Sequence, residues 1–180
     1  MTDEAGQDLA SAAEEVEPVR VLMASPIGRL GIEFRGTFVA AIKIQPSRSE
    51  ARRYQRLDKV DLTDFLLEAL GRLSELLAGI RPSAGLEIDL QPSGVAGFTR
   101  RVLKETRRIG YGKTWSYKKL AEACRQPNAY RKVQAALLQN PIPILIPCHR
   151  VVPQKGGVGA YVGGTKRKQK LLLIESHSLG

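Results

Sequence analysis

The apolar residues of this 180-residue chain change their spacing near residues 91–97, and this change constrains the fold more than any other feature. The segment contains Pro92, Gly94 and Gly97, which favour a linker over a helix or strand. Before it, apolar residues come in short runs between turns and in one helical stripe, and after it they mostly recur every three or four positions. The sequence therefore predicts an α/β (α+β) chain in which a strand-rich part precedes a helical part.

The first part is expected to form a small antiparallel sheet with one helix. The predicted strands cover residues 20–24, 29–35 and 38–45. A helix is predicted from Leu62 to Leu77, with Asp61 as its N-cap, because apolar residues recur there at helical spacing. That stripe consists of Leu62, Leu66, Ala69, Leu70, Leu73 and Leu77. The alternation over residues 86–90 is compatible with one more strand.

The second part is expected to be mostly helical. An apolar stripe under a basic face predicts a helix that begins near Phe98. Two shorter helices are predicted over residues 116–124 and 129–138, the first burying Leu120 and Ala123 and the second capped by Asn128. The second should bury Val133, Ala136 and Leu137 and expose Arg131, Lys132 and Gln134. Two short helices across a tight turn are typical of a helix-turn-helix, although a helical hairpin without a ligand has the same pattern.

The charge is distributed unevenly, which bears on the partner. Residues 1–17 contain six acidic and no basic residues, so the rest of the chain has 28 basic against 12 acidic residues and a net charge of +16. Such an excess favours a polyanionic partner, although it also serves solubility or adaptation to heat or salt. We expect residues 1–19 to be a disordered acidic leader, followed by an N-terminal α/β domain over 20–91 and a C-terminal domain over 98–176.

Several classes of protein are disfavoured by the composition. No apolar run approaches the roughly 20 residues that a membrane helix needs, and the N-terminus lacks the pattern of a signal peptide. Cys124 and Cys148 cannot form a disulfide framework, and with His149 and His177 they are the only cysteines and histidines. A zinc cage would need all four, so we expect no metal.

Residues 146–152, Ile-Pro-Cys-His-Arg-Val-Val, contain the most reactive group of the chain, the thiol of Cys148. A thiol is a strong nucleophile as its thiolate, which a nearby proton acceptor or positive charge makes accessible. The imidazole of His149 follows it directly. The alternative is a buried cysteine that packs as a small apolar residue.

Pro147-Cys148-His149-Arg150-Val151 resembles the active-site signature of the O6-alkylguanine-DNA alkyltransferases. The resemblance extends over about residues 96–176 in the expected order, and Ser25–Leu30 is similar to the start of the family's N-terminal domain. The further matching segments are Phe98–Leu103, Tyr111–Tyr117, Arg131, Asn140-Pro141, Gly159–Gly164 and Leu171–Glu175.

The resemblance implies a suicide repair protein that flips O6-alkylguanine out of double-stranded DNA and transfers the alkyl group irreversibly to Cys148. It implies catalytic roles for Cys148, His149, Glu175 and Asn140. It also implies substrate-binding roles for Tyr117, Val151, Tyr161 and Val162, and DNA-binding roles for Arg131, Tyr117, Ser116 and Lys132. By the same resemblance Arg131 fills the vacated base stack. We expect a cytoplasmic monomer without a cofactor.

Each of these positions also has an ordinary structural explanation. Glu175 could be a solvated residue at a helix end, Asn140 part of an Asn-Pro turn, and Tyr117 an amphipathic aromatic at a helix start. In an extended segment the side chains of Cys148 and His149 would point to opposite faces. We therefore expect a water molecule to link the thiol to the imidazole.

The chain also departs from the family pattern. Tyr130, Lys132 and Gln134 occupy positions where small residues are common, Val162 replaces a serine, and Gly110 replaces a proline. These changes bear on DNA affinity and lesion preference more than on thiol chemistry. Two other hypotheses are a lesion-binding module without catalysis, which Cys148 argues against, and a cysteine hydrolase with repeated turnover.

Overall fold

The computed structural model describes residues 17–61, 63–81, 86–88, 90 and 93–177. Its first part is a four-stranded sheet in the order β3-β2-β1-β4. The strands are β1 (Val19–Met23), β2 (Leu30–Arg35), β3 (Phe38–Ile44) and β4 (Gln55–Arg56). The first three pair antiparallel, and β4 pairs parallel with β1. The predicted antiparallel strands are confirmed to within one residue at each end, and β1 begins at the last residue of the expected leader.

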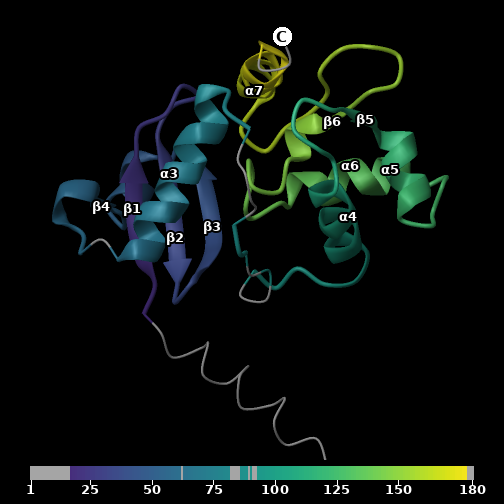
Figure 1. The fold of residues 1–180 in the computed structure, drawn as a ribbon. Helices are drawn as coiled ribbons and strands as arrows, with labels where there is room; N and C mark the ends of the chain where they lie inside the picture. Colours follow the sequence, from purple (N-terminus) through teal and green to yellow (C-terminus); the bar gives the residue numbers. More distant parts are fainter. Residues whose placement is uncertain (1–16, 62, 82–85, 89, 91–92, 178–180) are drawn as a thin grey trace, which may run out of the picture.

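The helix α3 (Asp64–Ala78) covers one face of this sheet (Figure 1). The predicted N-cap at Asp61 is wrong, because Thr63 directly precedes the helix and its hydroxyl accepts a hydrogen bond from the Leu66 amide. Five residues of the predicted stripe are buried, Leu66, Ala69, Leu70, Leu73 and Leu77, whereas residue 62 lies outside the described residues. Gly79 ends the helix in the left-handed conformation at φ 87°.

Short elements complete this part of the chain. The helix α2 (Arg48–Ala51) and the 3-10 turn η1 (Leu57–Lys59) flank β4. The strand considered for residues 86–90 is absent from the described part of that segment, in which Ile88 forms only an isolated bridge with Val39.

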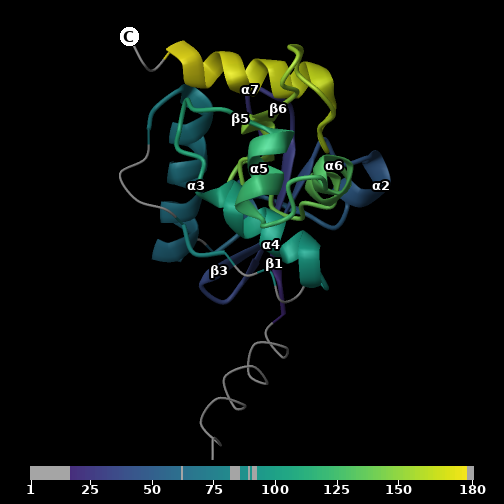
Figure 2. The same cartoon turned by 90° about the vertical axis from the view of Figure 1, so that its right-hand side faces the viewer.

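The second part contains α4 (Gly97–Arg107), α5 (Tyr117–Ala123), α6 (Tyr130–Leu138) and α7 (Thr165–His177). The two-residue strands β5 (Trp115–Ser116) and β6 (Val151–Val152) pair parallel. The helices α4, α5 and α6 pack against one another, and α5, the turn and α6 form the helix-turn-helix arrangement (Figure 2).

Two details of the helix-turn-helix differ from the prediction. Ala123 is exposed, and Ala121 and Cys124 are buried beside Leu120 instead, because the apolar side of α5 is rotated by part of a turn. Asn128 does not cap α6, because Ala129 holds the cap position and makes no side-chain bond there. The predicted burial of Val133, Ala136 and Leu137 is confirmed, as is the exposure of Arg131, Lys132 and Gln134.

Residues 139–147 connect α6 to the 3-10 turn η2 (Cys148–Arg150) and join the two parts of the molecule. The amide of Ile42 in β3 donates to the Pro141 carbonyl at 2.8 Å, and Ile142 and Ile146 are buried in the core. The helix α7 lies over the junction, where it contacts α3 and η2 (Figure 1). The turn that carries Cys148 is thus held from several sides.

Candidate active site around Cys148

Cys148 begins the 3-10 turn η2 and is 3% exposed. Its sulfur accepts a hydrogen bond from the Asn140 amide nitrogen Nδ2 at 3.0 Å. The same nitrogen donates to the Ile146 carbonyl at 2.9 Å, and Oδ1 of Asn140 accepts from the Ile142 amide at 3.0 Å. Asn140 therefore holds the loop before the cysteine and contacts the sulfur itself, which an ordinary Asn-Pro turn would not do.

The expectation that Cys148 and His149 lie in an extended segment is wrong. They lie in a 3-10 turn, in which the amide of Arg150 bonds to the Pro147 carbonyl at 2.9 Å. Side chains of neighbouring residues still diverge in such a turn, because it has three residues per turn. Within the described residues no hydrogen bond joins the sulfur to the imidazole.

His149 and Glu175 form a buried pair. The imidazole Nε2 lies 2.8 Å from the Glu175 oxygen Oε1, and both side chains are almost inaccessible to solvent. Glu175 lies near the end of α7, which continues to His177, so it is not a solvated residue at the helix end. The tertiary fold brings together two residues that are 26 positions apart.

Arg150 completes this network, and its role was not predicted from the sequence. Its Nε bonds to both Glu175 oxygens at 2.9 and 3.1 Å, and its Nη2 bonds to Oε1 at 2.9 Å. Its Nη1 donates to the Ile109 carbonyl at 2.6 Å, while the Gly112 amide donates to Glu175 Oε2 at 3.0 Å. The only available signal was its position beside His149, in a segment otherwise rich in apolar residues.

The pKa shifts of His149 and Glu175 determine the protonation state of each partner. Burial raises the pKa of Glu175, but the hydrogen bonds from His149 and Arg150 outweigh it and hold the pKa at about 2. Burial lowers the pKa of His149 below its usual 6.5, although Glu175 opposes this. At neutral pH the glutamate is therefore ionised and the imidazole neutral.

These protonation states determine which nitrogen of the His149 imidazole can accept a proton. Because an ionised carboxylate only accepts hydrogen bonds, Nε2 of His149 carries the proton and Nδ1 has the free electron pair. Nδ1 is buried and has no hydrogen-bond partner among the described residues. The imidazole is thus a proton acceptor with one fixed end and one available end.

The thiol, by contrast, is protonated at rest. Burial raises the pKa of Cys148 to about 11, and the Asn140 hydrogen bond and the charge of Lys168 only partly oppose it. Thiolate is therefore scarce at neutral pH, and the sulfur needs a base during its reaction.

The four predicted substrate-binding residues differ in their burial and in their contacts with this region. Tyr117 begins α5, and its hydroxyl lies 2.7 Å from where a Cβ of Gly159 would stand, so only glycine fits there. Tyr161 is buried with its hydroxyl unpaired among the described residues, and its ring meets His149 edge to face at 6.3 Å. Val151 is fully buried, whereas Val162 is 42% exposed. Val162 lines a cavity of about 330 Å³ with Asn140, Pro143 and residues of β3.

The predicted DNA-binding residues lie on α5 and α6. Ser116 caps α5 by accepting a hydrogen bond from the Lys119 amide at 3.1 Å. Arg131 and Lys132 are exposed in the first turn of α6, where the Arg131 guanidinium lies 5.8 Å from the Tyr130 ring centre. Tyr117 belongs to the region of the thiol, so the structure separates these residues into an inner and an outer group.

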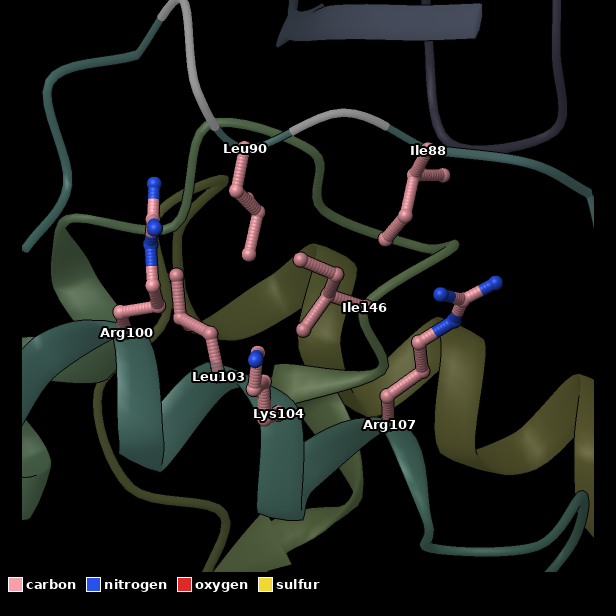
Figure 3. Close-up of a pocket in the computed structure, with 7 residues that line it drawn as sticks. All are labelled: Ile88, Leu90, Arg100, Leu103, Lys104, Arg107 and Ile146. Carbon is pink, nitrogen blue, oxygen red and sulfur yellow. The ribbon is translucent and has the colours of Figure 1, made fainter. Parts of the chain in front are cut away.

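A groove separate from the cavity at Val162 lies between α4 and the residues before it, which include Ile88 and Leu90 (Figure 3). Its volume is about 230 Å³, and its lining combines apolar side chains with Arg100, Lys104 and Arg107 of α4. Arg100 donates to the Val95 carbonyl and Arg107 to the Leu86 carbonyl, so both hold the preceding segment against the helix. No predicted site residue lines this groove.

The described residues contain neither a metal-binding cluster nor a membrane-spanning helix. Cysteines, histidines and carboxylates do not gather there in a group of three or more that could hold a metal ion. No helix in the same residues has the length and apolar character to cross a membrane.

Comparisons with known proteins agree with this geometry. Residues 97–177 match the model of the 6-O-methylguanine DNA methyltransferase DNA-binding domain. The methylated-DNA–protein-cysteine methyltransferase of Mycobacterium leprae is 34% identical over 87% of this chain and 92% of that protein. Its counterpart in Mycolicibacterium paratuberculosis is 35% identical over 84% and 88%.

A solved structure extends the likeness to the whole fold. The crystal structure of Mycobacterium tuberculosis OGT in complex with DNA superposes with a TM-score of 0.75 at 30% identity, over 88% of this chain and 93% of that one. Sequence and fold agree over both parts of the molecule. The chain belongs to the methylated-DNA–protein-cysteine methyltransferase family.

Proposed function

We propose that this protein repairs O6-alkylguanine in double-stranded DNA by moving the alkyl group to the sulfur of Cys148. The observation that carries the proposal is the 3.0 Å contact between Asn140 and the sulfur, beside a buried His149–Glu175 pair. A nucleophile, a base and a carboxylate that orients the base are the parts of an activated thiol. Family membership supports DNA with alkylated guanine as the substrate.

The transfer is a displacement at the alkyl carbon. His149 Nδ1 takes the thiol proton, through a bridging water, as the sulfur forms a bond to carbon. The bond from carbon to guanine O6 breaks, and its electron pair stays with the guanine, which regains neutrality by accepting one proton. The net products are a thioether on Cys148 and unmodified guanine, without a cofactor or redox step. Water does not cleave a thioether, so each molecule reacts once.

The guanine must leave the base stack, because a thiol that is 3% exposed cannot be reached by a base inside a duplex. We assign Tyr117, Val151, Tyr161 and Val162 to the pocket that receives it. Burial raises the pKa of Tyr161 well above its usual value, so its unpaired hydroxyl can donate a hydrogen bond to the base.

The outer group of residues is assigned to the duplex. Exposed Arg131 in α6 is suited to fill the space that the flipped guanine leaves, and Lys132 to contact phosphate. Ser116 and Tyr117, at the start of α5, are assigned to DNA binding as well, and Tyr117 also belongs to the inner group at the pocket. These roles belong to the domain over residues 98–176, with residues 20–91 as its support. We further propose that the protein is a cytoplasmic monomer.

Mass spectrometry after incubation with a duplex containing O6-methylguanine tests the proposal. One methyl group per protein molecule is expected, and Cys148→Ala should abolish the gain. Cys124→Ala is the matched control, because Cys124 is the other buried free cysteine and should not be needed. A gain that survives Cys148→Ala, or no gain in the unaltered protein, would refute the function.

A further inference from the structure

Lys168 of α7 is a buried cation that contacts the residues just after the turn of Cys148. It is 0% exposed, whereas every other lysine of the chain is exposed. Its ammonium Nζ donates to the Val151 carbonyl at 2.5 Å and to the Ala160 carbonyl at 3.1 Å. Burying a charged group costs free energy. We therefore expect a buried lysine to be retained for its contribution to the structure or chemistry of the site.

The two carbonyls belong to different segments of the candidate site. Val151 follows the turn that carries Cys148 and His149, and Ala160 precedes Tyr161 in the glycine-rich loop. Lys168 therefore joins two segments of the proposed pocket, one at Val151 and the other at Ala160, the residue before Tyr161.

No carboxylate among the described residues neutralises the charge of Lys168. Across the part of the chain that the structure describes, it forms no ion pair, and the nearby Glu175 is engaged by Arg150 and His149. The other ionisable groups near it are Cys148 and His149 of η2, Tyr117 of α5, whose ring centre is 5.7 Å from Nζ, and Tyr161, the residue after the Ala160 carbonyl that accepts from Nζ. The site thus has one uncompensated positive charge, and the group that becomes negative during reaction is the sulfur.

We propose that Lys168 is a positioning residue whose uncompensated ammonium stabilises the negative charge that develops on the Cys148 sulfur, while its two hydrogen bonds hold the pocket segments together. The proposal deepens the proposed function and rests on it. A nearby positive charge typically lowers the pKa of an acidic group by about one to three pH units. Lys168 accordingly opposes the effect of burial on the pKa of Cys148.

The pH dependence distinguishes this role from simple packing. Burial lowers the pKa of Lys168 to about 8, although the thiolate opposes the shift. The ammonium is present below that pH and is lost as the pH rises through it. Its help to the sulfur should therefore be greatest near neutral pH and disappear above about pH 9.

The test is the rate at which iodoacetamide alkylates Cys148 between pH 6 and pH 10, in a Cys124→Ala background. Lys168→Gln keeps an amide that can donate to the two carbonyls but removes the charge. We expect the unaltered protein to react about tenfold faster than this variant at pH 7, and the ratio to approach one above pH 9. A ratio that is the same at every pH would mean a purely structural role and would overturn the proposal.

Two further variants complete the design. Lys170→Gln removes an exposed lysine from the same helix and should leave the profile unchanged. In the unaltered protein the pH–rate profile should change slope near pH 8, where the Lys168 ammonium is lost. Lys168→Arg keeps its charge at high pH, so its rate should rise through pH 8 to 9 without this break. A break at the same pH in Lys168→Arg would assign it to another group and also overturn the proposal, even where Lys168→Gln does not fold.

Failure of this inference and failure of the proposed function are distinguishable. Iodoacetamide contains no guanine, so a constant ratio leaves the methyl transfer from DNA untouched. Conversely, a protein that gains no mass from alkylated DNA but shows the expected pH-dependent ratio would retain the role of Lys168 and lose the repair function.

Discussion

Replacing Glu175 by glutamine should destabilise the protein strongly near neutral pH. The side chain keeps nearly the same shape but loses its charge, which leaves the buried Arg150 guanidinium without a compensating carboxylate. Removing one partner of a buried ion pair typically costs about 3–5 kcal/mol.

The pKa of Glu175 provides an independent magnitude. It falls from an ordinary 4.5 to about 2 on folding, and each pH unit corresponds to about 1.4 kcal/mol, so the ionised glutamate contributes about 3 kcal/mol. Because the folded-state pKa is the lower one, this stability is present above pH 4.5 and is lost as the pH falls from 4.5 towards 2. Both routes predict a loss of about 3 kcal/mol at pH 7.

Urea unfolding of the unaltered protein and Glu175→Gln, at pH 7 and at several values down to pH 3, measures this effect. The difference in unfolding free energy should shrink as the pH falls. Glu68→Gln is the matched control, because it removes a carboxylate from an exposed ion pair with Arg72 and should change stability by at most about 1 kcal/mol. Equal losses in the two variants, or a difference independent of pH, would refute the assignment of a buried, ionised Glu175.

Three further predictions concern the pocket, the duplex and the leader. Gly159→Ala should slow methyl transfer more than Gly157→Ala, since both glycines have left-handed backbones but only a Cβ at Gly159 meets the Tyr117 hydroxyl, at 2.7 Å; equal rates of methyl transfer would contradict this contact. Arg131→Ala should slow reaction with alkylated duplex much more than with free O6-benzylguanine, and the same loss in both rate assays would argue against a role in the duplex. Removing residues 1–17 takes the net charge from +10 to +16, so DNA affinity measured across a salt series should rise most at low salt; an unchanged affinity would show that the leader does not act on DNA binding through charge.

Local features of the fold were predictable where a pattern is repeated. Short runs between turn residues placed β1, β2 and β3 to within one residue, and the leucines of α3 identified its buried side. The helix starts were less predictable, because several capping side chains stand close together and packing selects one. Thr63 rather than Asp61 begins α3, and Ala129 rather than Asn128 precedes α6.

The candidate site shows the same division. The short motif at residues 147–151 identified Cys148 and its neighbour His149 as reactive groups, since their chemistry is a property of residue type. Arg150 stood in that motif without a role, and Lys168 stood among other basic residues at the start of α7, where nothing in its surroundings distinguished it. Its complete burial became visible only when α7 packed against the glycine-rich loop.

By itself the sequence determined which groups can react, where the strand-rich part gives way to helices, and to which family the motifs are similar. These are local properties, set by the chemistry and spacing of residues near one another in the chain. Only the tertiary structure decided the protonation states of the site, because burial and contact between residues as distant as His149 and Glu175 set them. The same packing buried one lysine of a basic run against the Val151 and Ala160 carbonyls, without an ion-pair partner in the described part of the chain.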